Sequence, residues 1–401
     1  MSEAVESKAA PGTTGPSLQA AGAGLLVAVV GFSSSFAVVL QGLIGIGATE
    51  AEAASGLMAL SITMGLCGIW LSLRSRLPVS VAWSTPGAAL LATTGVLDGG
   101  FAAAVGAFLI CGLLVVVAGL WRPLGRWVAA IPPALANAML AGVLLTFCLW
   151  PMRALAEGPE LALPVILAWA VTWRFRRLFA VPVALVAAFI AIAVTTDLPA
   201  LDGAALLPQP VFILPEFSFG ALVGIALPLF IVTMASQNIP GIAVLNANGY
   251  RPAPGPLFAT TGVFSLLSAP FGGHAVNLAA VTAALCAGQE AEPDPRRRYW
   301  AAVVAGAFYI LFGLLAGAIT AFVAAVPAYL ILMVAGLALL GPFASALTEA
   351  LAAPDDRLAA VVTLLGTASG LSFFGIGSAF WGLVAGLGIL ALTRWKPRFG
   401  G

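Results

Sequence analysis

The residues best suited to chemistry lie in two short interruptions of an otherwise apolar chain. The first interruption, Pro78–Gly87, holds three hydroxyl side chains and a tryptophan. The second, Pro270–Asn277, holds a Gly-Gly pair followed by His274, the one histidine of the chain. Unwound backbone is tolerated at membrane depth only where protein or a water-filled cavity covers it. Interruptions at matching places in two halves of a chain are typical of a binding site near the middle of the membrane.

Each interruption predicts the start of a helix. In the first, Thr85 would cap the free amides, and Pro86 loses no hydrogen bond at the first helical position. In the second, Gly272–Gly273 would let the backbone approach a ligand closely. We expect a helix to begin directly after this pair, with His274 and Asn277 in its first turn. A helix N-terminus presents unpaired N–H groups and the positive end of the dipole. Two such ends facing each other would form an anion site; the alternative is a pair of kinks that only bend helices.

His274 is the candidate proton carrier, since no Asp or Glu lies within the core of any predicted span. An ionisable group within the membrane is a functional candidate by default. A bound carboxylate would favour the protonated ring, so that anion and proton load together. The alternative is a neutral histidine that is hydrogen-bonded in the core. Hydrolysis within a membrane needs paired acids, a metal cluster or a Ser/His/Asp arrangement, so the sequence argues against an enzyme, and it offers no ligand set for a metal or cofactor.

Neutral polar side chains occur on two further predicted spans. Ser34 and Gln41 are seven residues apart and share a helical face. Gln237 and Asn238 lie in an apolar stretch and need hydrogen-bond partners from protein or ligand, although either glutamine could instead hold two helices together. Four aromatic residues are available to contact an aromatic ligand: Phe36, Trp83, Phe230 and Phe271. The sequence therefore predicts a small, aromatic-lined anion site with little fixed charge.

The composition places these residues in a membrane protein. Of 401 residues, 61% are hydrophobic and 8% are charged, whereas a soluble domain would carry roughly a quarter charged residues. The net charge of +1 argues against a nucleic-acid partner. Because a span needs about 20 mostly apolar residues, we predict fourteen spans, at 19–43, 53–73, 79–97, 100–120, 127–150, 159–173, 178–196, 219–241, 255–270, 274–289, 299–324, 327–344, 358–371 and 374–393.

The basic residues provide a separate test of this span count. With a cytoplasmic N-terminus, 16 of the 17 Lys and Arg residues fall in inner loops and tails, and only Arg153 lies outside. Positive residues concentrate on the cytoplasmic side, so we predict fourteen spans with both termini inside. The polar connection Asp197–Phe217 divides them into seven and seven. An odd number of spans in each half predicts an inverted repeat, with spans three and ten broken.

Three stretches carry a family resemblance. Ser236–Asn246 and Phe271–Ala280 resemble the signature stretches of the benzoate/proton symporter family, called BenE, and Pro295–Trp300 is similar to its inner loop. The likeness extends over about residues 20–395. It implies an all-α polytopic membrane fold similar to that of nucleobase and SulP-type transporters, with a core that moves against a gate like an elevator. After a flexible tail at 1–18, the core would comprise 19–120 (spans 1–4) and 217–325 (spans 8–11), and the gate 121–216 (spans 5–7) and 326–401 (spans 12–14 and the C-terminal tail).

The resemblance also implies a set of substrate contacts and a function. The contacts would come from Ser34, Gln41, Ser84, Thr85, Gly87, Gln237, Asn238, Gly273, His274, Ala275 and Asn277. Related nucleobase carriers use acidic residues in spans eight and ten, and the amides and histidine found here instead favour an anion. The implied function is uptake of benzoate or a similar small aromatic carboxylate with a proton across the cytoplasmic (inner) membrane, in a protein whose gate often forms a homodimer. An uncoupled channel or facilitator, or a sulfate- or bicarbonate-type carrier, are the alternatives.

Overall fold

The computed structural model describes residues 15–121, 123, 132–195, 209–279, 281–371, 373 and 377–394. Several sequence predictions lie outside these residues. They concern most of the N-terminal tail, the start of the fifth span, the first part of the connection Asp197–Phe217, the boundary between the last two spans, and the C-terminal tail. Some of the basic residues used to orient the chain belong to these segments.

The described chain is built almost wholly from helices. The first half comprises α1 (Leu18–Ser33), α2 (Phe36–Gly45), α3 (Glu50–Ser75), α4 (Thr85–Thr94), α5 (Gly100–Leu120), α7 (Pro133–Cys148), α8 (Trp150–Glu157), α9 (Pro159–Phe175), the 3₁₀ turn η1 (Arg177–Phe179) and α10 (Ala180–Thr195). The second half comprises α11 (Phe219–Ala221), η3 (Leu222–Ala226), α12 (Leu227–Thr233), η4 (Met234–Asn238), α13 (Ile239–Ala247), α14 (Pro254–Ser268), η5 (Ala269–Phe271), α15 (Val281–Ala287), α16 (Tyr299–Leu314), α17 (Ala316–Ala325), α18 (Ala328–Ala350), η6 (Pro354–Asp356), α19 (Arg357–Ala368) and α20 (Ser378–Arg394).

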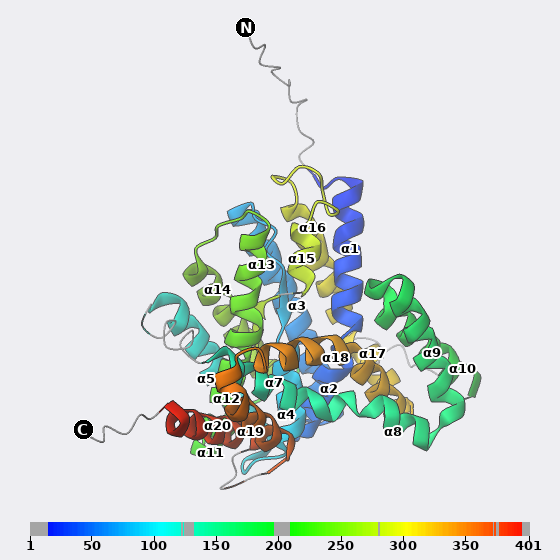
Figure 1. Cartoon of the computed structure of the whole chain (residues 1–401). Helices are drawn as coiled ribbons and strands as arrows, with labels where there is room; N and C mark the ends of the chain where they lie inside the picture. The colour runs from blue at the N-terminus through cyan, green and yellow to red at the C-terminus, as the bar shows by residue number, and fades with distance from the viewer. Residues whose placement is uncertain are drawn as a thin grey trace.

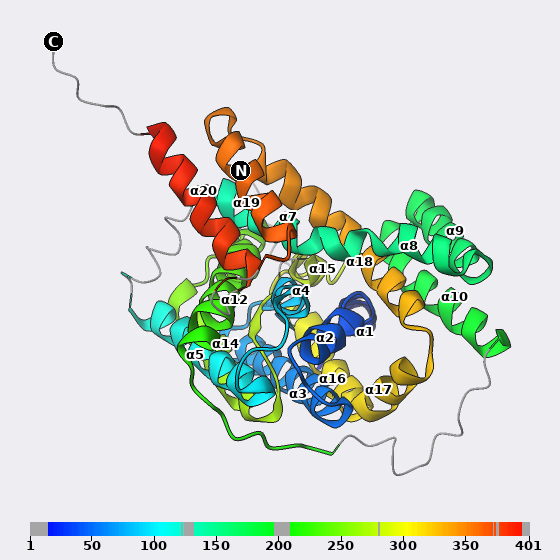
Figure 2. The same ribbon diagram turned by 90° about the horizontal axis from the view of Figure 1, so that it is seen from below.

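The helices pack in two groups. In the first group α3 packs on α16, α5 on α14, α1 on α16 and α2 on α4; in the second, α7 packs on α18 and α19, α19 on α20 and α9 on α10. Small residues permit close contacts, as where Gly65 of α3 faces Gly306 of α16 and a Cβ on either would meet the other's carbonyl oxygen. In both views α9 and α10 lie at one edge and α19 and α20 at the opposite edge, with α7 and α18 between them (Figures 1 and 2).

Apolar helices of spanning length occur at many of the predicted spans. Within the described residues, seven helical stretches are long and apolar enough to cross a membrane, and α16 with α17 forms an eighth candidate bent by 58°. The other predicted spans contain shorter helices, such as α14 with 15 residues and α19 with 12. The chain is thus a multi-pass membrane protein, while the count of fourteen and the inverted repeat stay predictions.

Two short strands depart from the predicted all-α fold. β1 (Val81–Trp83) and β2 (Val276–Leu278) pair in antiparallel fashion, with Ala82 opposite Asn277. β1 lies in the middle of the first interruption and β2 at the end of the second, and the paired residues Ala82 and Asn277 are 195 positions apart in sequence. Pairing satisfies backbone N–H and C=O groups that would otherwise be orphaned in an apolar interior. The two interruptions are therefore in direct contact.

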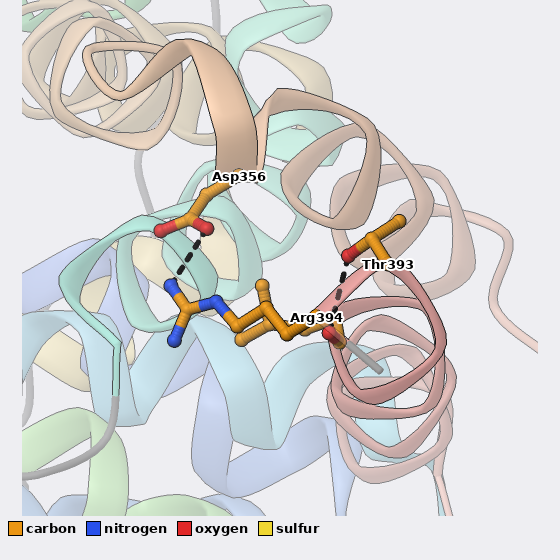
Figure 3. Close-up of polar contacts among 4 residues, drawn as sticks. Asp356, Thr393 and Arg394 are labelled. Atoms are coloured by element: carbon orange, nitrogen blue, oxygen red, sulfur yellow. Dashed lines mark hydrogen bonds and ion pairs between the residues drawn. The ribbon is translucent and has the colours of Figure 1, made fainter. Parts of the chain in front are cut away.

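One surface ion pair closes the hairpin of α19 and α20. Arg394, at the end of α20, donates to Asp356 of η6 at 2.9 Å, as Figure 3 shows. The Arg394 side chain is 61% exposed, and ion pairs of this kind contribute about 0–1 kcal/mol. The contact therefore adds little to packing that α19 and α20 already make.

Candidate functional site

The first interruption forms a capped helix start directly after β1. Ser84, and not Thr85 as predicted, is the N-cap of α4, because its hydroxyl accepts the N–H of Gly87 at 3.2 Å. The same hydroxyl accepts from the Thr233 hydroxyl at 2.9 Å, and the Ser84 N–H donates to the carbonyl of Ala275 at 3.0 Å. Thr85 is then the first residue of the helix. Its N–H, like the first amides of any helix, has no partner within the helix.

The second interruption is a strand where a helix start was predicted. Gly272 adopts a left-handed conformation with φ of 89°, which favours glycine, and the chain then continues into β2. Asn277 lies within β2, His274 precedes it, and α15 begins only at Val281. The prediction of a helix beginning at His274 and Asn277 is therefore wrong, since pairing with β1 holds this backbone extended.

A cavity of about 250 Å³ lies beside β1 and the start of α4. Its volume is just below the roughly 300–1,000 Å³ of typical small-molecule sites, which suits a single-ring ligand. Trp83 forms an aromatic wall and is 2% exposed, with its indole N–H donating to the Ser35 hydroxyl at 2.8 Å. The exposed Arg177 and Pro342 also line the cavity and mark its mouth.

Both packing groups contribute to the cavity. The first group supplies α1, β1 and the start of α4, together with Gln237 of η4, Thr282 of α15 and Tyr309 of α16. The second group supplies Leu144 of α7, Arg177 and its neighbours before and in α10, and part of α18. The cavity thus lies between the two groups, where a relative movement of the groups would change its walls.

Three of the eleven predicted site residues line this cavity: Ser34, Thr85 and Gln237. The other eight lie outside its lining, and for them ligand contact stays a prediction; they are Gln41, Ser84, Gly87, Asn238, Gly273, His274, Ala275 and Asn277.

Several of these eight residues have evident packing roles. The Asn238 side chain accepts the N–H of Leu278 at 2.9 Å and so fixes β2 to η4. A Cβ on Gly87 would collide with Leu229 of α12, and a Cβ on Gly273 would collide with Ser268. These residues hold the interruptions in place, whether or not they also touch a ligand.

His274 is fully buried just before β2 and does not line the cavity. Its ring packs edge-on against Phe108 of α5, with 6.3 Å between ring centroids. Nδ1 accepts the N–H of Ala275 at 2.6 Å, which leaves the proton of a neutral ring on Nε2. Within the described residues Nε2 has no hydrogen-bond partner, and the same holds for the Oδ1 atom of buried Asn277.

Most hydroxyls around the cavity are already bonded to protein. Ser34 donates to the carbonyl of Gly31, Tyr309 donates to that of Val27, and the Thr282 hydroxyl is 2.9 Å from that of Ser80. In contrast, the Thr85 hydroxyl and the Gln237 amide lack protein partners among the residues that the structure describes. These two groups are available to hydrogen-bond a ligand.

A π turn determines where Gln237 and Asn238 point. η4 is a π-helical turn within the long apolar helix from Phe219 to Ala247, a type of turn frequent at functional sites. Within it, Gln237 lines the cavity while Asn238 bonds β2. In the sequence, these adjacent amides in an apolar run predict only that both need hydrogen-bond partners, and they do not predict the turn.

Arg177 is the site residue that the sequence analysis missed. It was assigned to an inner loop and the site was predicted to carry little fixed charge, yet its side chain lines the cavity. Three arginines lie at the end of α9 and just after it, and their spacing gives no signal for which of them faces a ligand. Across the described ranges, no cluster of three or more His, Cys, Asp or Glu residues could hold a metal ion.

Comparison with known proteins decides the family. The family model described as benzoate membrane transport protein, BenE, matches residues 15–392. The chain belongs to the BenE family. BenE proteins are membrane transport proteins and not enzymes.

Two curated relatives match nearly the whole chain, and one solved structure shares its fold. It is 43% identical over 364 residues to inner membrane protein YdcO of Escherichia coli (strain K12), covering 91% of this chain and 93% of that protein. It is 32% identical over 374 residues to the benzoate membrane transport protein of Acinetobacter baylyi, covering 92% and 94%. The transmembrane domain of the cyanobacterial bicarbonate transporter BicA shares the fold, with a TM-score of 0.58 at 13% identity over 92% of this chain and 97% of that one.

Proposed function

We propose that this BenE protein is a secondary active transporter that takes up benzoate or a similar small aromatic carboxylate together with a proton. The observation that supports this most is the cavity between the two packing groups, with an aromatic wall at Trp83 and free donors at Thr85 and Gln237. The start of α4 adds the positive end of a helix dipole to that cavity. The relative in Acinetobacter baylyi is named for benzoate transport.

Transport would proceed by movement of one packing group against the other. The first group, with α1–α5 and α12–α16, would act as the core, and the second, with α7–α10 and α18–α20, as the gate. Because the cavity has walls from both groups, sliding the core would carry the ligand from one membrane face to the other. The same proposal includes an inner-membrane location, both termini in the cytoplasm and a homodimer through the gate.

Proton coupling at His274 would act through the backbone. The ring Nδ1 accepts the N–H of Ala275, and the carbonyl of Ala275 accepts the N–H of Ser84, the N-cap of α4. Protonation of Nδ1 removes the acceptor in the first of these bonds. The Ala275 N–H would then lose its partner and the backbone there would shift. The hydrogen bond from Ser84 to the Ala275 carbonyl would carry that shift to the start of α4, where Thr85 contacts the ligand.

The test is uptake of labelled benzoate into proteoliposomes with and without an inward proton gradient. We expect saturable accumulation that requires the gradient and that other aromatic carboxylates compete away. Saturable uptake that only equilibrates would indicate a facilitator. Competition by sulfate or bicarbonate in place of aromatic acids would indicate an inorganic-anion carrier, whereas the Trp83 wall favours a ligand with an aromatic ring.

A further inference from the structure

Arg177 lies where two elements of the gate-side group meet the cavity. It is the first residue of η1, between α9 and α10, and its exposed side chain lines the cavity at the mouth. Leu178 and Val181, which follow it, line the same cavity. Its neighbours Arg174 and Arg176 are exposed as well but do not contribute to the lining. Of these three arginines, only Arg177 lines the cavity.

The guanidinium of Arg177 is held in position without being neutralised. It lies over the ring of Trp173, 5.5 Å from the ring centroid. Among the described residues it makes no hydrogen bond and no ion pair. Stacking on an aromatic face occupies the flat side of the group and leaves its N–H donors, which lie in the plane, available to a carboxylate. Arg is suited to this task because its fork of donors matches a carboxylate bidentately.

A carboxylate in this cavity needs such a partner. Leaving water for an apolar cavity is costly for an anion unless a charge and hydrogen bonds replace its hydration. Thr85 and Gln237 offer neutral hydrogen bonds only. Of the described residues that line the cavity, Arg177 is the one that carries a charge.

We infer that Arg177 recognises the carboxylate of the substrate from the gate side, opposite the start of α4. This inference rests on the proposed function and deepens it, since it assigns the selection of acids over neutral aromatic compounds to a residue of the gate. A carboxylate held this way lies between the two packing groups. When the core moves away from the gate, the carboxylate would lose its contact with Arg177. The contact would therefore form in one transport state only.

The experiment measures benzoate affinity of the full-length protein in detergent by calorimetry. Four variants are compared with wild type: Arg177→Gln and Arg177→Met remove the charge, Arg177→Lys keeps it, and Arg176→Gln is the matched control from the same turn. We expect the dissociation constant to rise about tenfold in the first two variants, to rise less in Arg177→Lys, and to stay at the wild-type value in Arg176→Gln. Size-exclusion profiles and thermal unfolding midpoints report whether each variant is folded.

The other outcomes overturn either this inference or the function on which it rests. Wild-type affinity in Arg177→Gln, or equal losses in Arg177→Lys and Arg177→Gln, would show that the charge does not recognise the carboxylate. An equal loss in Arg176→Gln would show that the turn contributes only a general positive potential. A wild-type protein that binds no aromatic carboxylate would overturn the proposed function, and this inference with it.

Discussion

β1 and β2 are paired residue for residue, yet the two interruptions that contain them contribute differently to the cavity. The first interruption gives its tryptophan, Thr85 and the start of a ten-residue helix to the cavity. The second keeps its polar residues, His274 and Asn277, buried and outside the lining, and only Ala279, just after β2, reaches the cavity from this part of the chain. Matching positions in sequence therefore do not imply matching roles. We expect the first interruption to contact the ligand and the second to respond to its binding.

The largest difference in uptake and stability should appear between substitutions of Trp83 and of Val276, which face each other in the strand register. Trp83→Ala removes a cavity wall and the bond to Ser35, and we expect a loss of about 3–5 kcal/mol of stability together with loss of uptake. Val276→Ala removes less buried volume and should retain most uptake. Thermal unfolding in detergent and benzoate uptake test this pair. Equal loss of uptake in both variants would contradict the assignment of separate roles.

The second expected effect separates coupling from binding. His274→Gln should abolish gradient-driven accumulation, because no titratable group remains at this position, while benzoate affinity changes less than about twofold, since His274 does not line the cavity. Phe108→Leu is the control, because it removes the ring contact to His274 and should preserve coupling. Accumulation by His274→Gln at wild-type level would assign the proton to another group.

Thr85→Val should weaken benzoate binding and keep proton coupling, the reverse of His274→Gln. Losing a hydroxyl that hydrogen-bonds a carboxylate is expected to weaken benzoate binding about tenfold, or about 1.4 kcal/mol, while the remaining transport still depends on the proton gradient. Thr93→Val is the matched control on the same helix, because the Thr93 hydroxyl bonds the carbonyl of Leu90. If both variants bind benzoate as wild type does, the hydroxyl of Thr85 does not contact the ligand.

The smallest effect is expected at the helix cap. Ser84→Ala removes the acceptor for the N–H of Gly87 and for the Thr233 hydroxyl, and capping residues contribute about 0.5–2 kcal/mol. The unfolding midpoint should fall and benzoate affinity should weaken slightly, since the cap orients Thr85 indirectly. An affinity loss greater than that of Thr85→Val would mean that Ser84 itself binds the ligand.

Local chemistry in the sequence was enough to find the interruptions but not to orient them. Thr85 and Pro86 predicted a helix start to within one residue, because capping and proline preferences are local. His274 precedes β2, and the place of its side chain depends on the pairing of β2 with a segment in the other half of the chain, which no local pattern encodes.

Arg177 shows the same limit at longer range. Its place in the cavity depends on how α10 packs against α1 and α18, and no local pattern encodes that packing. The BenE family and the membrane class, in contrast, follow from composition and from motifs that can be read along the chain.

The π turn at Met234–Asn238 has a consequence for chain length. A π turn holds one residue more than the regular helix around it, so deleting Ala235 would let the helix close into α geometry without a break. The helix would survive and its flanking segments would keep their faces, because the π turn had absorbed the extra residue, but the widened turn that carries Gln237 and Asn238 would be lost. Gln237 and Asn238 could then no longer serve the cavity and β2 together. Deleting Ala235 would therefore keep the span folded while removing the arrangement of its site residues. Substitution of a single side chain cannot do that.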